Sequence, residues 1–168
     1  PRNEDSMAIH IPQGSLLTSK GIVIAIADGV SAAEAGREAS EIAVKGFVSD
    51  YYSTPDSWSV KQSAHKVLIA LNRWLFGQGQ KFLEAEKGYV TTFSTVILKS
   101  RSAYVFHVGD SRIYRLRDGV LEQLTRDHVA RISAEQCYLA RALGIDVNLD
   151  VDFRTLDLQQ NDLFLLTT

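Results

Sequence analysis

The sequence lacks the features that mark several large classes of protein. Its single cysteine, Cys137, cannot form an internal disulfide, which is typical of chains that work in a reducing compartment such as the cytoplasm. The longest apolar run, Ile22 to Ala27, is too short to span a bilayer, and no signal peptide is visible. No charge of one sign dominates, since the net charge is -2, so neither nucleic acid nor an anionic membrane is an expected partner.

The composition that remains is that of one globular domain. The chain has 168 residues, of which 45% are hydrophobic and 23% charged, with no internal repeat and no low-complexity segment. It begins at Pro1 without an initiator methionine and stops at Thr168, within an apolar run typical of a strand. We therefore expect residues 1–168 to be a single domain that is incomplete at the N-terminus and lacks its last strands at the C-terminus.

The most informative stretch is an apolar run that ends in Asp28-Gly29. Its residues are apolar on both faces, which predicts a central, covered strand. A strand that stops on an aspartate presents a carboxylate at the sheet edge, where a ligand can reach it, and the glycine permits close approach. Taken alone, the same pair is also typical of a plain strand-to-helix turn in which Asp28 stabilises helix amides.

Periodicity predicts helices inserted among mainly antiparallel strands, so an α+β fold is favoured over a doubly wound parallel sheet. Ser31 and Glu34 match a capping box at the start of the first helix, and Asp56 or Ser57 is the expected cap of the second. The expected helices are 31–50, 58–75 and 132–143. The expected strands are 7–12, 16–18, 21–27, 89–99, 103–108, 111–117, 120–124, 151–156 and 163–166, with 16–18 and 21–27 as a hairpin closed by 19–20 and another hairpin turn at Asp118-Gly119.

Three acidic turns lie at or near strand ends. They are Asn3-Glu4-Asp5-Ser6, Asp28-Gly29 and the stretch from His107 to Arg112, which contains Asp110. Carboxylates gathered without clustered cysteine or histidine suit hard cations such as Mg²⁺ or Mn²⁺. Two such ions can activate a water and bind a phosphate oxygen. The alternatives are structural: Asp110 would be a turn residue paired with Arg112.

The ordered set of motifs resembles the metal-dependent, type 2C serine/threonine protein phosphatases. The resemblance covers nearly the whole chain, and its most specific part is the stretch from His107 to Gly119. The motifs that carry it are Asn3-Glu-Asp-Ser6, Ala27-Asp-Gly29, Thr91-Thr92, His107-Val-Gly-Asp-Ser-Arg-Ile-Tyr-Arg-Leu-Arg-Asp-Gly119, Leu124-Thr-Arg-Asp-His128 and Arg141-Ala-Leu-Gly144. The variant around Asp28 to Ser40 is most similar to the phosphatase half of bacterial proteins that fuse this domain to a kinase-like domain.

This resemblance implies a fold, a metal centre and a reaction. The fold is a four-layer α-β-β-α sandwich of two mainly antiparallel sheets flanked by helices. Asp28 would bridge two Mn²⁺ or Mg²⁺ ions, the Gly29 carbonyl would bind one of them and Asp5 would hold metal-bound water. Asp110 would help bind a third, weaker metal. A metal-bridging hydroxide would hydrolyse phosphoserine or phosphothreonine in a phosphoprotein substrate, as part of signalling with a fused or cognate kinase.

The chain also departs from the family pattern. The phosphate-binding arginine of the family would precede Pro1, and Arg2 is its nearest substitute. Two further metal-binding aspartates would follow Thr168, so this chain alone would be metal-poor. An alternative function is therefore a non-catalytic module of the same fold that binds a phosphoprotein or partner. A third is an esterase with Ser111 of Gly109-Asp110-Ser111 as nucleophile, although no later Asp-x-x-His pair supports it.

Overall fold

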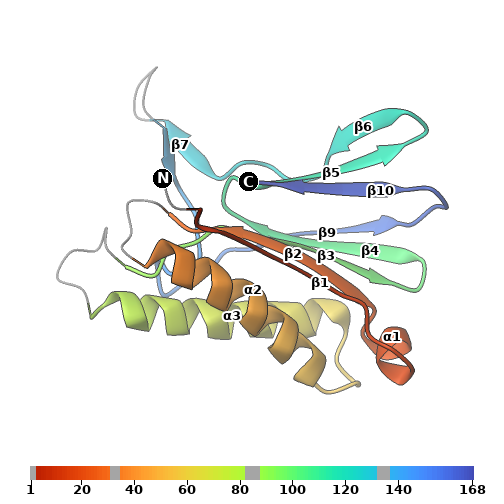
Figure 1. Cartoon of the computed structure of the whole chain (residues 1–168), viewed down its shortest axis with the longest axis horizontal. Helices are drawn as coiled ribbons and strands as arrows, with labels where there is room; N and C mark the ends of the chain where they lie inside the picture. Colours follow the sequence, from red (N-terminus) through yellow and green to blue (C-terminus); the bar gives the residue numbers. More distant parts are fainter. Residues whose placement is uncertain (1–2, 31–34, 82–87, 132–136) are drawn as a thin grey trace.

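Two antiparallel sheets lie face to face, and two long helices pack beneath the larger sheet (Figure 1). The computed structural model describes residues 3–30, 35–81, 88–131 and 137–168. The helices are α1 (Ser15–Ser19), α2 (Gly36–Ser53) and α3 (Val60–Gly79). The strands are β1 (Asp5–His10), β2 (Ile22–Asp28), β3 (Phe93–Lys99), β4 (Ser102–Val108), β5 (Arg112–Arg117), β6 (Val120–Gln123), β7 (Val129–Arg131), β8 (Cys137–Leu139), β9 (Asp152–Asp157) and β10 (Leu163–Thr167).

The strand order confirms the prediction of antiparallel sheets. The larger sheet has the order β1-β2-β3-β4-β9, and the smaller has the order β10-β5-β6. A separate two-stranded hairpin joins β7 to β8. Asp118 and Gly119 turn β5 into β6 with φ values of 51° and 77°, which matches the hairpin turn expected from this pair.

Alternation of side chains along β2 builds the main core. Val23, Ala25 and Ala27 are buried and belong to one cluster with residues of α2 and α3, including Phe47 and Leu68. Successive strand residues point to opposite faces, so the isoleucines between them face the other side of the sheet. A second, smaller cluster lies between the two sheets. Its buried members are Val96, Ala103, Val105, Ile113 and Leu124.

The expected fourth layer is not seen in the part of the chain that the structure describes. Helix α2 packs against β1 and β2, and α3 packs against β4, so both helices cover the larger sheet. On the smaller sheet, β6 and β10 expose large apolar side chains. The exposed side chains are Val120, Leu121, Leu163 and Leu165.

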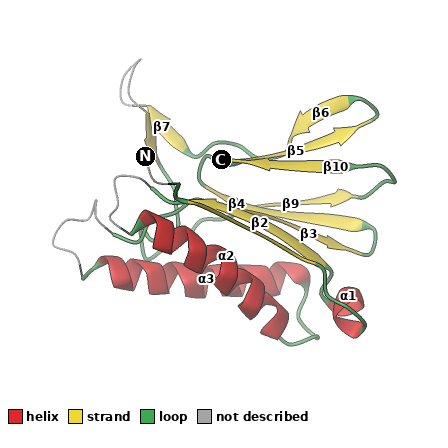
Figure 2. Cartoon of the chain, viewed as in Figure 1, coloured by secondary structure: helices red, strands yellow, loops and turns green. Residues whose placement is uncertain are grey.

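Two local predictions were wrong (Figure 2). Residues 16–18 do not form a hairpin strand, because Ser15–Ser19 is a short helix and the antiparallel partner of β2 is β1. The segment 137–143 is not helical: Cys137–Leu139 pairs with Val129–Arg131, and residues 132–136 lie outside the described residues. Pairing with β7 outweighed the helical spacing of the apolar residues in this segment, because strand formation depends on contacts outside the segment.

Helix boundaries differ modestly from the expected ones. The capping box at 31–34 lies outside the described residues, and α2 begins at Gly36. Helix α3 is capped by Ser59, whose hydroxyl accepts a hydrogen bond from the Gln62 amide at 3.1 Å, and not by Asp56 or Ser57. Within the described residues, no helix is long and apolar enough to cross a membrane.

Candidate functional site

Antiparallel pairing of β1 and β2 brings two of the expected metal ligands together. Asp5 and Asp28 are directly opposite each other in the register, at the start of β1 and the end of β2. The next residue, Gly29, donates its amide hydrogen to the Glu4 carbonyl at 3.1 Å. Directly opposed residues hold their Cβ atoms about 5 Å apart, so the two carboxylates share one end of the sheet.

Two buried threonines at the start of β3 fix the backbone of Asp28. The Asp28 carbonyl accepts hydrogen bonds from the Thr92 amide at 2.9 Å and the Thr91 hydroxyl at 3.0 Å. The Asp28 amide donates to the Thr92 hydroxyl at 2.9 Å. The sequence analysis included this threonine pair as a motif but gave it no role. The two hydroxyls lie just before an apolar strand, and the structure shows that they hold the Asp28 backbone in place.

Gly29 is required by close approach. A Cβ atom at Gly29 would lie 2.2 Å from the carbonyl carbon and oxygen of Gly36, which opens α2. A Cβ atom at Gly36 would in turn lie 2.5 Å from Oε2 of Glu4. That oxygen is buried and, among the described residues, has no hydrogen-bond partner. An unpartnered buried carboxylate oxygen costs free energy, and a bound cation would offset that cost.

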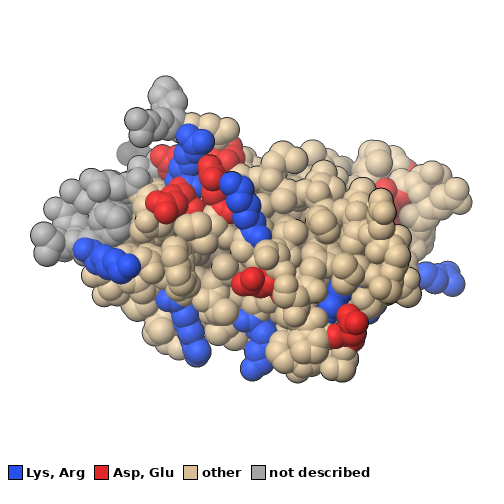
Figure 3. Space-filling view, turned by 60° about the horizontal axis from the view of Figure 1, so that its bottom comes forward, with Lys and Arg blue, Asp and Glu red and all other residues tan. Residues whose placement is uncertain are grey.

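The acidic residues interact electrostatically at this end of the sheet. Burial, followed by the charge and hydrogen bond of Asp5, raises the pKa of Asp28 to about 6, and the charges of Asp110 and Glu4 add to the effect. Figure 3 shows acidic and basic side chains gathered at one end of the face that it presents. A carboxyl group that resists ionisation beside other acids fits a divalent cation, which would neutralise the local negative charge.

Side chains that bind one metal ion must lie closer together than the charges that raise the pKa of Asp28. Within residues 3–30, 35–81, 88–131 and 137–168, no three Asp, Glu, His or Cys side chains are close enough to form a metal-binding group by themselves. Asp28 and Asp5 are therefore an opposed pair of carboxylates and not a complete ligand group. Arg2, the expected phosphate ligand, lies outside the described residues.

Asp110 projects from a tight loop between β4 and β5. Its neighbour Gly109 has a φ of +117°, and a Cβ atom there would lie 2.6 Å from the Thr92 side chain. On the other side, Ser111 is buried and its hydroxyl lies 2.7 Å from that of Thr92. A buried, hydrogen-bonded serine is a poor nucleophile, which argues against the esterase hypothesis. Arg112 is not the partner of Asp110, since it pairs with Asp127.

His107 of β4 lies beside the loop that precedes β7. His107 is buried, with its ring nitrogens 2.8 Å from the Ser94 hydroxyl and 3.0 Å from the Arg126 carbonyl. Burial and the nearby His128 lower the pKa of His107, so its ring is neutral. His107 is therefore a core histidine whose two ring nitrogens both have partners.

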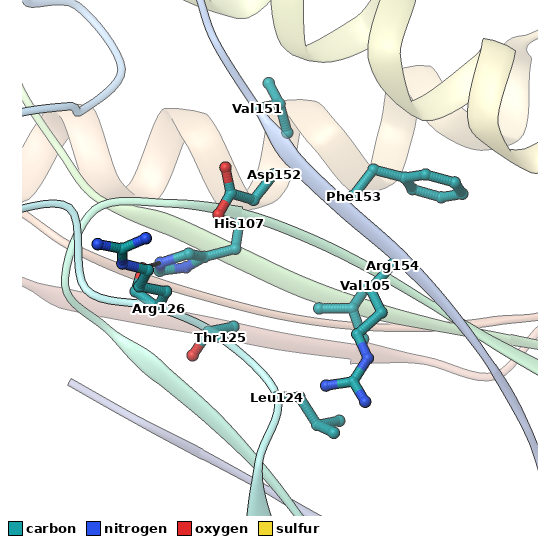
Figure 4. A pocket seen from close by; sticks show the side chains of 9 residues that line it. All are labelled: Val105, His107, Leu124, Thr125, Arg126, Val151, Asp152, Phe153 and Arg154. Carbon is teal, nitrogen blue, oxygen red and sulfur yellow. Dashed lines mark hydrogen bonds between the residues drawn. The ribbon is translucent and has the colours of Figure 1, made fainter.

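A cavity of about 470 Å³ opens beside His107, between the two sheets (Figure 4). Asp152 and Phe153 of β9 line it together with Arg126. Asp152 also borders a second cavity of about 310 Å³, which includes His128 and Arg141. Both cavities are distinct from the end of β2 that carries Asp28.

Comparison with known proteins decides the family. The family model described as protein phosphatase 2C matches residues 2–168.

The chain belongs to the protein phosphatase 2C family.

Related bacterial proteins carry names that agree with this membership. The serine/threonine phosphatase stp of Listeria monocytogenes is 28% identical over 163 residues, which cover 86% of this chain and 64% of that protein. Protein phosphatase PhpP of Streptococcus pneumoniae is 27% identical over 163 residues, covering 87% of this chain and 65% of the relative. The chain thus spans somewhat less than two thirds of the length of these curated relatives.

Solved structures of the family have the same fold. The Mycobacterium tuberculosis serine/threonine phosphatase PstP aligns with a TM-score of 0.75 at 23% identity, covering 98% of this chain and 71% of that chain. The catalytic domain of PstP in complex with two manganese ions aligns with a TM-score of 0.75 at 24% identity, covering 98% and 70% of the two chains. These alignments confirm the α+β arrangement of antiparallel sheets and helices.

Proposed function

We propose that the chain is the larger part of a metal-dependent phosphatase that hydrolyses phosphoserine and phosphothreonine in proteins. Family membership supports the reaction class, and relatives are named serine/threonine phosphatases. The single observation that carries the proposal is the opposition of Asp5 and Asp28 across β1 and β2, with the pKa of Asp28 raised to about 6. This donor set suits a divalent cation and leaves the pair electrostatically unfavourable without one.

The residues present would supply part of the ligand set for a pair of Mn²⁺ or Mg²⁺ ions. Asp28 and the Gly29 carbonyl would hold the pair directly, Asp5 would act through water, and Asp110 would contribute to an additional site. Such ions supply, when bound, an activated water and positive charge for the phosphoryl oxygens. A family relative, the PstP catalytic domain, is described in complex with two manganese ions, which supports the choice of metal.

The protein's own groups would orient the reaction. Thr91 and Thr92 hold the Asp28 backbone through three hydrogen bonds, so its carboxylate needs little rearrangement when a metal binds. Arg2 is proposed to bind the phosphate by its likeness to the family arginine. The substrate class implies a kinase that forms the phosphoester, so a fused or cognate kinase is the proposed partner, and the cytoplasm is the proposed compartment.

A specific observation keeps the binding module as a second candidate. The described residues include no complete group of three metal-binding side chains, so the metal pair needs ligands beyond those described. We propose that residues 1–168 form one phosphatase-like domain that requires such ligands for activity. A domain of this fold without them would bind a phosphoprotein or another partner and leave the phosphoester intact.

The test is hydrolysis of a phosphothreonine peptide by the full-length protein with and without Mn²⁺. We expect turnover that requires Mn²⁺ and that Asp28→Asn abolishes. Asp50→Asn on the exposed surface of α2 is the matched control and should retain full turnover. Turnover that persists in Asp28→Asn contradicts the metal mechanism. Absence of turnover in the wild type, with retained phosphopeptide binding, favours the binding module.

A further inference from the structure

His128 forms a reciprocal pair of hydrogen bonds with the loop that carries Asp110. The His128 amide donates to the Gly109 carbonyl at 2.8 Å, and the Gly109 amide donates to Nδ1 of His128 at 3.1 Å. The histidine is 7% exposed, so water does not compete freely for either bond. Two bonds in opposite directions fix both polar groups of one glycine, which also has the uncommon φ of +117°.

The opposite side of this loop is held by Thr92. A Cβ atom at Gly109 would lie 2.6 Å from the Thr92 side chain, so the glycine packs directly against it. The Thr92 hydroxyl also accepts the hydrogen bond from the Asp28 amide. Gly109 is therefore held between the residue that fixes Asp28 and His128, and Asp110 follows immediately in the chain.

Asp152 lies beside the other ring nitrogen of His128. Because Nδ1 accepts a hydrogen bond from Gly109, the neutral ring must carry its proton on Nε2. That nitrogen is buried and lies 3.1 Å from Oδ2 of Asp152, which is a charge contact, since Nε2 has no hydrogen-bond partner among the described residues. Burial opposes ionisation of Asp152, yet its contact with His128 and the charge of Arg141 hold the pKa of its carboxyl below the ordinary value. An ionised Asp152 favours the tautomer that the Gly109 bond needs.

Asp152, His128 and His107 are neighbours in space. Figure 4 shows Asp152 on β9 beside the His107 ring, at the rim of the cavity between the sheets. The rings of His107 and His128 lie 4.7 Å apart, and each has its own set of bonds. The described contacts of the His128 ring are with the loop, with Asp152 and with His107, while its carbonyl accepts a hydrogen bond from the Ala140 amide at 2.7 Å. The ring therefore acts through the loop.

We propose that His128, through its two hydrogen bonds to Gly109, is a positioning residue that sets Asp110 relative to Asp28 and so controls how tightly the additional metal is held. The proposal rests on the proposed phosphatase function, because Asp110 is a ligand only in that context. Residues that orient metal ligands commonly change metal affinity by 10- to 100-fold when they are replaced, although they touch no metal themselves.

Two amide variants of His128 separate this role from a merely structural one. In His128→Asn the side-chain oxygen lies near the place of Nδ1 and can accept from Gly109, whereas the longer amide of His128→Gln reaches toward the place of Nε2. The two differ little in polarity. His65→Asn, at an exposed position on α3, is the matched control. Circular dichroism on each variant verifies the fold.

The first measurement is amide hydrogen exchange at Gly109, observed by NMR on the metal-free full-length protein. We expect exchange on the order of tenfold faster in His128→Gln than in the wild type, with His128→Asn close to the wild type. Equal exchange rates in the two variants overturn the proposal. This readout does not depend on activity, so it tests the geometry even where the phosphatase function fails.

The second measurement is the Mn²⁺ concentration that gives half-maximal phosphopeptide hydrolysis. His128→Gln should raise it on the order of tenfold, and His128→Asn should restore a value close to that of the wild type. Similar values in all three proteins contradict positioning by His128 while leaving the phosphatase function intact. A wild type that fails to hydrolyse with Mn²⁺ refutes the proposed function, and the Gly109 exchange then supports or contradicts the local geometry by itself.

Discussion

Replacement of Asp28 by asparagine should stabilise the metal-free protein while removing its metal response. The carboxylate of Asp28 is partly buried and faces Asp5, and together these effects raise its pKa from 3.8 to about 6. An acid with a raised pKa in the folded state holds its proton more tightly when folded than when unfolded. Stability therefore falls as the pH rises from about 4 to about 6, and stays lower above that range.

The size of the effect follows from the same pKa. A change from 3.8 to about 6 corresponds to about 3 kcal/mol at full strength. Asp28 is only partly buried, so solvent screening reduces this figure and we expect about 1–2 kcal/mol at pH 7. Asparagine keeps the shape and can donate to the Asp5 carboxylate, so the variant should gain this amount.

The assay is urea unfolding from pH 4 to pH 8 in the presence of a chelator, for the wild type, Asp28→Asn and the control Asp50→Asn. The wild type should lose stability between pH 4 and pH 6 relative to Asp28→Asn, while Asp50→Asn follows the wild type. Mn²⁺ should then stabilise the wild type and have little effect on Asp28→Asn. If Asp28→Asn is no more stable than the wild type at pH 7 without metal, the argument from carboxylate repulsion is refuted.

Two further predictions concern packing and a partly buried ion pair. Gly29→Ala places a Cβ atom 2.2 Å from the Gly36 backbone, so the free energy of unfolding of this variant should fall by about 3 kcal/mol or more. In Gly77→Ala on α3 the new Cβ atom meets no atom within 4 Å, so the free energy of unfolding should rise by about 0.5–1 kcal/mol. Thermal denaturation compares the two variants. Asp162 pairs with Arg117, and the hydrogen bond between them lowers the pKa of Asp162 to about 2, so this pair stabilises the fold above about pH 4 and is lost as the pH falls toward 2. Asp162→Asn should therefore raise the midpoint pH of acid unfolding, and an unchanged midpoint would contradict the role of the pair.

The sequence predicted the end of β2 well because a single strand determines it. The apolar run before Asp28 is visible in the pattern, and the structure places Asp28 as the last residue of β2. The glycine after it was expected to permit close approach, which the contact with Gly36 confirms. Features that depend on one element alone are the ones that periodicity can detect.

The neighbour of Asp28 was a harder problem. Periodicity paired 21–27 with 16–18, whereas β2 pairs with β1, and this pairing places Asp5 opposite Asp28. The resemblance to a family grouped the two aspartates, although the hydrophobic pattern had joined the wrong strands. A short apolar run such as Leu16-Leu17 suits a helix as well as a strand, so local pattern could not decide between the two partners.

The roles of Thr92 and His128 lie beyond any local pattern. The Thr92 hydroxyl accepts a hydrogen bond from Asp28, 64 residues away, and the His128 imidazole accepts one from Gly109, 19 residues away. Both bonds form only when distant segments have come together. Dependence on a partner outside the segment also explains the wrong prediction at 137–143. Residues of β8 pair with β7, and no pattern within β8 itself predicts this pairing. Polar contacts between distant segments need coordinates, because many side chains in the sequence could form each bond.

The arrangement around Thr92 accounts for how a folded chain can keep unfavourable carboxylates together. Repulsion between Asp5 and Asp28 would relax if the strand ends were free to separate. The Asp28 backbone cannot readily move away from β1. Thr91 and Thr92 bind its amide and its carbonyl on one side, and the next residue, Gly29, donates a hydrogen bond to Glu4 on the other. The pairing of β1, β2 and β3 thus holds the acidic side chains together against their electrostatic repulsion. A cation in the proposed metal centre would offset this cost without rearranging the strands, as a preorganised site requires.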